Sequence, residues 1–242
     1  GLGAVGLITY MRTDSLRISN EALADAEKFI RQTFGEEYAL SKPRVFKSKK
    51  NAQDAHEAIR PTMVELVPSK VKANLTSDQY RLYKLVWERF IASQMANALL
   101  DTVSVDITAG KHGFKASGFT VKFDGFTALY VETTDGDEEN GARLPALEEG
   151  EVLAVAEVKP NQHFTQPPAR YTEASLIKDL EENGIGRPST YAPTLTTIQQ
   201  RGYVEREGKA LKPTALGEVT TKLMEGHFAE IVNVDFTAHM ES

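Results

Sequence analysis

The sequence predicts an α+β chain with more than one domain. Residues 20–34 and 77–99 repeat apolar side chains at helical spacing, whereas residues 103–131 alternate apolar and polar side chains as strands do. After the proline pair at 167–168, the pattern becomes helix, glycine turn, helix and hairpin. A chain of 242 residues is long enough for two or three small domains. We expect a mainly helical domain at 1–99, an antiparallel β segment at 100–166 and a mostly helical domain at 167–242.

The helices of the first part have clear ends. Asn20 is a suitable N-cap for the helix at 20–34, and Gly35 is a natural stop. Thr76 and Gln79 have the spacing of a capping box, so the next helix should begin at residue 77. The run before them, Val5 to Ile8, is short and apolar, which predicts an extended segment.

The middle part predicts several strands. Residues 119–123 and 126–131 flank Asp124-Gly125, a dipeptide typical of hairpin turns, and residues 152–158 predict a further strand. Between them lies an acidic run at 134–141, which lacks the position-12 glutamate of an EF-hand calcium loop. We therefore expect that run to be a loop and not a metal site.

The last part predicts a winged helix-turn-helix. One helix is opened by Thr172 and ended by Asn183-Gly184, and a second should run from about residue 190 to 201, with Pro193 in its first turn. A hairpin around Gly208-Lys209 and a final helix at about 214–225 follow. This order of elements is typical of that DNA-binding motif.

Composition limits the possible functions. The chain has no cysteine, which excludes disulfides and thiolate metal sites, and no apolar run approaches the length of a membrane span. The net charge is −6, with most of the acidic excess between residues 101 and 160. Any site for a polyanion must therefore be local and built from few arginines.

Tyr10 is the first candidate site residue. It follows the apolar run, and Arg12 stands two positions later. A tyrosine phenol can attack phosphorus as a covalent nucleophile, and a guanidinium can bind two phosphate oxygens and stabilise the phenolate. From this stretch alone, the favoured interpretation is a core strand that ends in an ordinary surface tyrosine.

His56 and Arg60 form a second candidate group. Their spacing of four, with Glu57 between them, predicts one face of a helical turn that Pro61 ends. Such a face suits an anion, and the alternative is a solvent-facing ion pair beside a neutral histidine. The site is not that of a zinc protease, because position 60 is arginine. The basic loop at 41–55 is either solvated or lies near a phosphate backbone.

The third candidate group lies at helix starts of the last part. Arg170 and Thr172 precede one predicted helix, and Arg187, Ser189 and Thr190 stand at the start of the next. Hydroxyl groups and free N–H groups at helix N-termini suit anions. The alternative is that these residues only cap the helices.

Four motifs together resemble one family. They are Gly6-Leu7-Ile8-Thr9-Tyr10-Met11-Arg12-Thr13-Asp14-Ser15, Ala55-His56-Glu57-Ala58-Ile59-Arg60-Pro61-Thr62, Tyr171-Thr172-Glu173-Ala174-Ser175 and Gly184-Ile185-Gly186-Arg187-Pro188-Ser189-Thr190-Tyr191. In this order the chain resembles the type IA DNA topoisomerases, closest to the bacterial topoisomerase I group, over nearly its whole length. The resemblance implies winged-helix-like elements in the tyrosine domain and a β segment that belongs to the arch of the gate.

The resemblance also implies roles for the candidate residues. Tyr10 is expected to form a 5′-phosphotyrosyl link with single-stranded DNA, so that strands pass and negative supercoils relax without ATP. Arg12 and His56 are expected to hold the cleaved phosphate. The DNA-binding residues are then Arg60, Arg170, Thr172, Arg187, Ser189 and Thr190.

Parts of the family pattern have no counterpart here. Family members begin with an acidic Toprim domain that carries Mg²⁺, and many end in zinc ribbons. We therefore expect an internal fragment of a monomeric, cytoplasmic, nucleoid-associated enzyme, with magnesium ligands outside this chain and no relaxation activity on its own. The competing hypotheses are a non-catalytic winged-helix-like DNA-binding module, which would favour duplex DNA, and a plain interaction scaffold.

Overall fold

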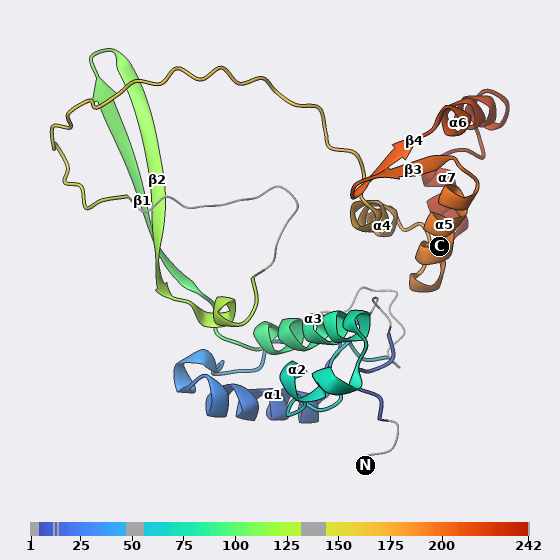
Figure 1. The fold of residues 1–242 in the computed structure, drawn as a ribbon, viewed down its shortest axis with the longest axis horizontal. Coiled ribbons are helices and arrows are strands. Elements are labelled where there is room, and N and C mark those ends of the chain that lie inside the picture. The colour runs from blue at the N-terminus through green and yellow to red at the C-terminus, as the bar shows by residue number, and fades with distance from the viewer. Residues whose placement is uncertain (1–4, 12, 14, 47–55, 132–143, 242) are drawn as a thin grey trace. The chain divides into compact units, whose positions relative to one another are not determined.

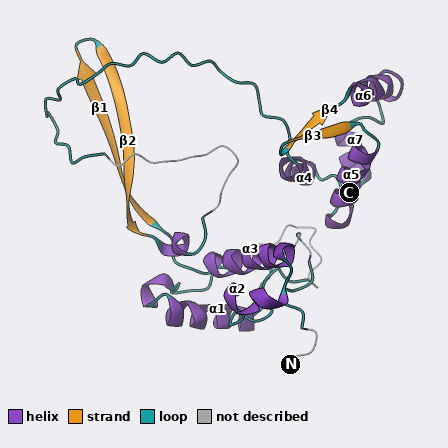
Figure 2. Cartoon of the chain, viewed as in Figure 1, coloured by secondary structure: helices purple, strands orange, loops and turns teal. Residues whose placement is uncertain are grey.

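The chain divides into two compact units, residues 1–155 and 156–242. The structure is a computed structural model that describes residues 5–11, 13, 15–46, 56–131 and 144–241. Helices and one two-stranded antiparallel hairpin occur in each unit (Figures 1 and 2). The α+β class is therefore confirmed, whereas the division into three domains stays a prediction.

A helical body forms the core of the first unit. Its elements are α1 (Asn20–Thr33), α2 (Pro68–Val71), α3 (Ser77–Ser93) and the 3₁₀ turns Glu36–Tyr38 and Lys72–Asn74. The apolar stripes of α1 and α3 face each other, because Ile30 and Ile91 are fully buried and belong to one core cluster. The ring of Phe29 meets Trp87 edge-on, with 5.4 Å between centroids.

The ends of these helices follow local hydrogen bonding. The predicted capping box of Thr76 and Gln79 is confirmed. The N-cap of α1 is Ser19 and not Asn20, because Ser19 is extended and its hydroxyl accepts the N–H of Ala22. Helix α3 ends at Ser93 and not near residue 99. The guanidinium of Arg44 donates to the carbonyl of Ser93 at this end.

The predicted hairpin turn at Asp124-Gly125 is wrong. The hairpin consists of β1 (Leu99–Ala109) and β2 (His112–Phe123), so the chain turns at residues 110–111. Residues 125–128 form a 3₁₀ turn instead of opening a strand. The side chain of Phe126 packs against the helical core, and its N–H donates to the carbonyl of Ala96 over 2.9 Å. Phe126 therefore packs against the helical body and does not belong to a strand.

Two other predictions in this region have different outcomes. Residues 152–158 are described and carry no strand, so the predicted strand there is wrong. The acidic run at 134–141 lies outside the described residues. The base of the hairpin is held by Tyr38, whose hydroxyl donates to Asp124 over 2.7 Å and whose ring contacts Phe123 in a tilted arrangement, with 4.8 Å between centroids.

The second unit has the predicted order of helix, turn, helix and hairpin. Its elements are α4 (Glu173–Glu182), α5 (Pro188–Gln200), β3 (Val204–Glu207), β4 (Ala210–Pro213), α6 (Ala215–Phe228) and α7 (Val234–Met240). Thr172 caps α4 as predicted. Pro193 lies past the first turn, because α5 begins at Pro188 and not near residue 190.

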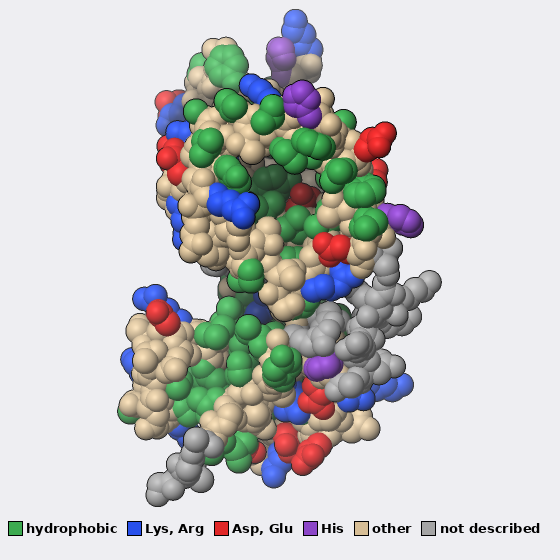
Figure 3. Space-filling view, turned by 90° about the vertical axis from the view of Figure 1, so that its right-hand side faces the viewer, with side chains coloured by type: hydrophobic (Ala, Val, Ile, Leu, Met, Phe, Trp, Pro, Cys, Tyr) green, Lys and Arg blue, Asp and Glu red, His purple; other side chains and the backbone are tan. Residues whose placement is uncertain are grey.

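The surface of the second unit is rich in apolar side chains (Figure 3). Exposed examples on α6 and α7 are Leu216, Val219, Leu223, Phe228, Val234, Phe236 and Met240. Within the described ranges, no helix is both long and apolar enough to cross a membrane.

Gly125 offers a test of how the hairpin joins the helical body. Its φ is +51°, and an added Cβ would lie 2.5 Å from the backbone carbon of Asn97. Gly125→Ala should therefore destabilise the first unit by about 2–4 kcal/mol, since both the backbone strain and the clash oppose folding.

Urea unfolding followed by fluorescence of Trp87, the only tryptophan of the chain, measures this unit alone. Gly113→Ala, at an open position of β2, is the control and should change stability by less than about 0.5 kcal/mol. Equal midpoints for the two variants would contradict the close approach.

Tyr83 predicts a loss of stability at high pH. Burial raises the pKa of its phenol to about 12, and the hydroxyl donates to the carbonyl of Leu66 over 2.6 Å. The unfolded phenol ionises near pH 10, so this contribution is complete below about pH 10 and is lost as the pH rises toward 12. The free energy of unfolding should fall by about 2 kcal/mol over that range.

Urea unfolding followed by Trp87 fluorescence, repeated across this pH range, measures the decline. In Tyr83→Phe, the free energy of unfolding should decline less than in the wild type. Part of it should persist, because a hydrogen bond to Asp124 raises the pKa of Tyr38 in the same unit. Tyr80→Phe, on the same helix, should keep the wild-type decline. An identical decline in all three chains would refute the assignment to Tyr83.

Candidate functional site

Tyr10 is positioned by a short antiparallel pairing. Ile8 forms an isolated bridge with Pro61. The N–H of Thr9 donates to the carbonyl of Arg60, and the N–H of Thr62 donates to the carbonyl of Leu7, each over 3.0 Å. These bonds flank the bridge, so Pro61 occupies a position where no N–H is needed. The pairing therefore brings the tyrosine motif and the histidine motif together.

The same segment is also held from its other side. The hydroxyl of Ser15, which is 5% exposed, donates to the carbonyl of His56 over 2.6 Å. The N–H of Ala58 donates to the carbonyl of Arg17 over 2.7 Å. Residues 7–9 and 15–17 thus bind one segment, 56–62, which restricts the position of Tyr10.

Tyr10 and His56 face each other at this junction. Their ring centroids are 6.0 Å apart, with the planes inclined by 38°. The tyrosine is 77% exposed, so a large substrate can reach its hydroxyl. The Nδ1 atom of His56 is buried and has no hydrogen-bond partner among the described residues. The arrangement presents an exposed phenol beside an imidazole ring.

The predicted helical turn at residues 56–60 is wrong. This segment is not helical, because its backbone pairs with the two halves of the tyrosine motif. The guanidinium of Arg60 binds the Glu57 carboxylate over 2.7 Å and 3.1 Å and the Pro61 carbonyl over 3.0 Å. Its side chain is only 14% exposed. Arg60 therefore stabilises the segment, and its contact with DNA stays a prediction.

Arg12 lies outside the described residues, so its predicted contact with phosphate has no structural account here.

Sequence reasoning missed Thr9 and Ser15. The hydroxyl of Thr9 donates to the carbonyl of Ala58 over 2.8 Å and accepts the N–H of Arg60. The available signal was a hydroxyl residue on each side of Tyr10 in the sequence, next to backbone groups that need hydrogen-bond partners.

A second group lies in the other unit, at the N-terminus of α5. The N–H of Arg187 donates to the hydroxyl of Thr190 over 2.8 Å, and that hydroxyl donates in turn to the carbonyl of Arg187. Ser189 is exposed in the first turn. Thr190 is therefore a structural cap, whereas the guanidinium of Arg187 is directed toward Glu241.

Arg170 and Thr172 do not join that group. They lie at the N-terminus of α4, where the Thr172 hydroxyl accepts the N–H of Ser175 over 3.1 Å. The ten residues of α4 separate this end from the turn before α5 by about 15 Å. Arg170 is exposed. The third predicted group is thus two separate positions on one unit.

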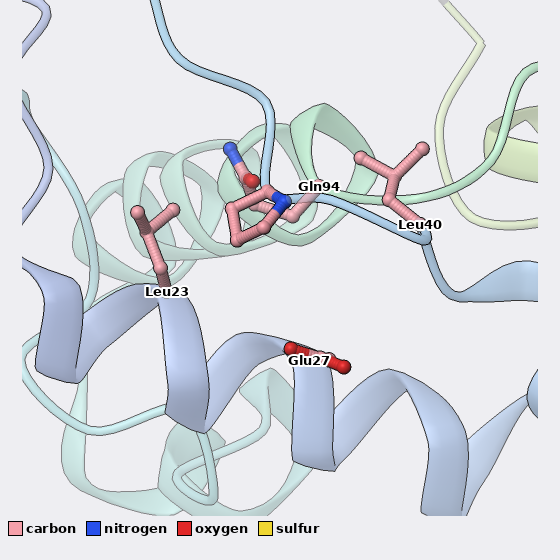
Figure 4. Close-up of a pocket in the computed structure, with 5 residues that line it drawn as sticks. Leu23, Glu27, Leu40 and Gln94 are labelled. Carbon is pink, nitrogen blue, oxygen red and sulfur yellow. The ribbon is translucent and has the colours of Figure 1, made fainter.

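A small pocket in the first unit is lined by other residues than the predicted site residues. This pocket, lined by Leu23, Glu27, Leu40, Pro43 and Gln94, lies between α1 and the end of α3 (Figure 4). Its volume of about 10 Å³ holds about one water molecule, and it contains none of the predicted site residues. In the same described ranges, no group of three or more His, Asp or Glu side chains could hold a metal ion.

Comparison with known proteins supports the motif set. A family model for DNA topoisomerases matches residues 3–242. The solved structure of full-length topoisomerase I from Thermotoga maritima is 39% identical and superposes with a TM-score of 0.81. The match covers 98% of this chain and 38% of the Thermotoga chain, so this chain spans well under half the length of that relative. Identity at this level over nearly the whole chain shows that the protein belongs to the type IA DNA topoisomerases.

Proposed function

We propose that this chain supplies the nucleophile of a type IA DNA topoisomerase. Tyr10 cleaves one strand of single-stranded DNA, another strand passes through the break, and the break is resealed, which relaxes negative supercoils. The observation that carries this proposal is the exposed Tyr10 phenol held 6.0 Å, between ring centroids, from His56. The proposal concerns the whole enzyme, of which these residues are the tyrosine-bearing part.

The reaction exchanges one phosphodiester for another. The hydroxyl oxygen of Tyr10 attacks phosphorus and loses its proton, the bond from phosphorus to the DNA 3′ oxygen breaks, and that oxygen takes up a proton. The tyrosine then carries the 5′ phosphate, and the free 3′ hydroxyl reverses the step. No bond of higher energy is made, so ATP is not required. Catalysis then depends mainly on position and on stabilisation of the charge on phosphate.

His56 and Arg12 are proposed to bind the phosphate that Tyr10 attacks. Because Nδ1 of His56 is buried, we assign the contact with a phosphate oxygen to Nε2. Arg12 stands two residues after Tyr10, and a guanidinium can donate two N–H groups to two oxygens of the same phosphate. Magnesium supplies further charge stabilisation in the proposed enzyme, and no described residue of this chain is assigned as its ligand.

The second unit is proposed to bind single-stranded DNA away from the cleaved bond. Its contacts would be Arg170, Thr172, Arg187, Ser189 and Thr190. Arg187 and Ser189 are exposed at the N-terminus of α5, where the helix dipole favours an anion. The acidic net charge of the chain is compatible with this, because the contacts are few and local.

A second candidate function is a non-catalytic DNA-binding module. The order α4, turn, α5 and the β3–β4 hairpin favours it, since winged helices bind duplex DNA with such elements. This alternative predicts that duplex binding exceeds single-strand binding and does not depend on Tyr10. The topoisomerase proposal predicts preference for single strands.

Replacement of Tyr10 tests the catalytic proposal. In the protein expressed from the complete coding sequence that contains these residues, Tyr10→Phe should abolish the covalent adduct with a 5′-labelled or 3′-labelled single-stranded oligonucleotide. The loss should be at least about 100-fold, because the attacking oxygen is gone. Denaturing gels and peptide mapping locate the DNA end and the linked residue.

Tyr80→Phe is the matched control for this experiment, because it removes a hydroxyl from α3 and leaves the ring in place under Lys72. It should keep the adduct at the wild-type level. An adduct that persists in Tyr10→Phe, or that maps to another residue, would overturn the assignment.

A pair of arginines on α5 tests the proposed DNA contact. Arg187 is the N-cap of this helix and Arg201 is its C-cap, so the two variants Arg187→Ala and Arg201→Ala remove the same charge from opposite ends. Arg187→Ala should weaken single-strand binding by the 242-residue chain about three- to tenfold and reduce the salt slope by about 1. Fluorescence anisotropy at several salt concentrations measures both. Equal losses in the two variants would indicate a general charge effect and reject a specific contact of Arg187.

A further inference from the structure

The guanidinium of Arg187 is already occupied by an anion of the same unit. One carboxylate oxygen of Glu241 accepts the N–H of Gly186 over 2.7 Å and lies 3.5 Å from Nη1 of Arg187. Nη2 of Arg187 donates to the backbone carbonyl of Glu241. Glu241 therefore lies where a backbone N–H and a guanidinium converge, just before the first turn of α5.

The backbone of the turn creates this position. Gly186 has a φ of +79°, a conformation that other residues rarely adopt. An added Cβ there would lie 2.8 Å from the Tyr191 ring. The turn directs the N–H of Gly186 to the same side as the guanidinium of Arg187, since both reach one carboxylate oxygen. A pair of donors that holds a carboxylate oxygen suits a phosphate oxygen equally well.

We propose that Glu241 is an internal competitor for the phosphate position formed by Gly186 and Arg187, and that single-stranded DNA displaces it when it binds. The inference rests on the proposed function, because it assumes that Arg187 contacts DNA. It adds a regulatory element. In the free enzyme the guanidinium of Arg187 is bound to Glu241, and DNA binding replaces this carboxylate with a backbone phosphate.

The exchange is feasible because the contact is exposed. The side chains of Arg187 and Glu241 are 55% and 36% exposed, and ion pairs of this kind contribute little net stability in water. Both states keep the guanidinium and the N–H hydrogen-bonded. The difference between them is therefore small, and a DNA strand held by other contacts can tip it.

The displacement has a consequence for α7. This helix has seven residues, Val234–Met240, and Glu241 is its C-cap. The guanidinium of Arg187 satisfies the carbonyl of Glu241 at this end and interacts favourably with the helix dipole. When DNA takes Arg187, α7 loses that contact. The amides of its last turn should then exchange with solvent faster in the DNA complex.

A charge-matched pair of variants tests the proposal on the 242-residue chain, with a single-stranded oligonucleotide as the probe. Glu241→Gln removes the competing charge, and Glu225→Gln removes an equal charge from the exposed surface of α6. We expect Glu241→Gln to bind about two- to fivefold more tightly than Glu225→Gln at low salt. In an Arg187→Ala background the two variants should bind equally. Circular dichroism checks that each variant is folded, and Glu241→Ala repeats the measurement with a smaller side chain.

Each outcome separates the inference from the function on which it rests. If Arg187→Ala binds as well as Arg201→Ala, the proposed DNA contact of Arg187 fails, and the competition fails with it. If Arg187→Ala weakens binding but Glu241→Gln matches Glu225→Gln, only the competition is rejected. If Glu241→Gln weakens binding, Glu241 aligns Arg187 for DNA and the proposal is reversed. Faster exchange in α7 on DNA binding supports the proposal, whereas unchanged exchange argues against displacement.

Discussion

The pairing of residues 7–9 with residues 60–62 is the interaction on which the site depends. It involves only two backbone hydrogen bonds around the Ile8–Pro61 bridge. Proline is tolerated because the bridge is the non-hydrogen-bonded kind, in which its missing N–H has no role. Together with the hydrogen bond from Ser15 to the carbonyl of His56, this pairing brings Tyr10 and His56, which are far apart in the sequence, to a ring-centroid distance of 6.0 Å.

The helical body anchors the segment that follows this pairing. The chain leaves the pairing at Thr62 and enters a segment that α3 holds by two side chains. Trp87 donates its indole N–H to the carbonyl of Val64 over 3.0 Å, and Tyr83 donates to Leu66. Because these aromatic rings are part of the buried core, displacement of the 56–62 segment would disturb packing as well as hydrogen bonds. The position of the exposed Tyr10 side chain therefore depends on residues of the buried core.

The second unit uses the same residue types for two purposes. Thr172 and Thr190 satisfy backbone N–H groups at helix starts, which are the groups that would otherwise be free to bind an anion. Arg187 and Gly186 direct their donors to an acidic side chain at the end of α7. An N-terminus rich in hydroxyls is thus largely self-satisfied. Under the proposed function, its capacity to bind DNA depends on donors that can exchange Glu241 for a phosphate, such as the guanidinium of Arg187.

Sequence patterns determined the elements whose signals are local. The stripe of α3, its capping box and the helix–turn–helix–hairpin order at 172–213 were predicted because periodicity and caps involve residues within a few positions of one another. The motif set also identified the family and singled out Tyr10 and His56. Predictions that depended on distant partners were less accurate. The hairpin turn, the absent strand at 152–158 and the non-helical backbone at 56–60 could not be predicted from local patterns.

Only the tertiary structure decided what each polar side chain binds. Arg60 and Arg187 look alike as candidates in the sequence, yet one is bound to Glu57 and a carbonyl in its own segment and the other to Glu241, 54 residues away. The physical reason is that a side chain takes the partner that folding brings within about 3 Å, and sequence spacing predicts this only inside a helix or a tight turn. The sequence by itself thus determined which residues are suited to the chemistry. The fold decided that Tyr10 meets His56.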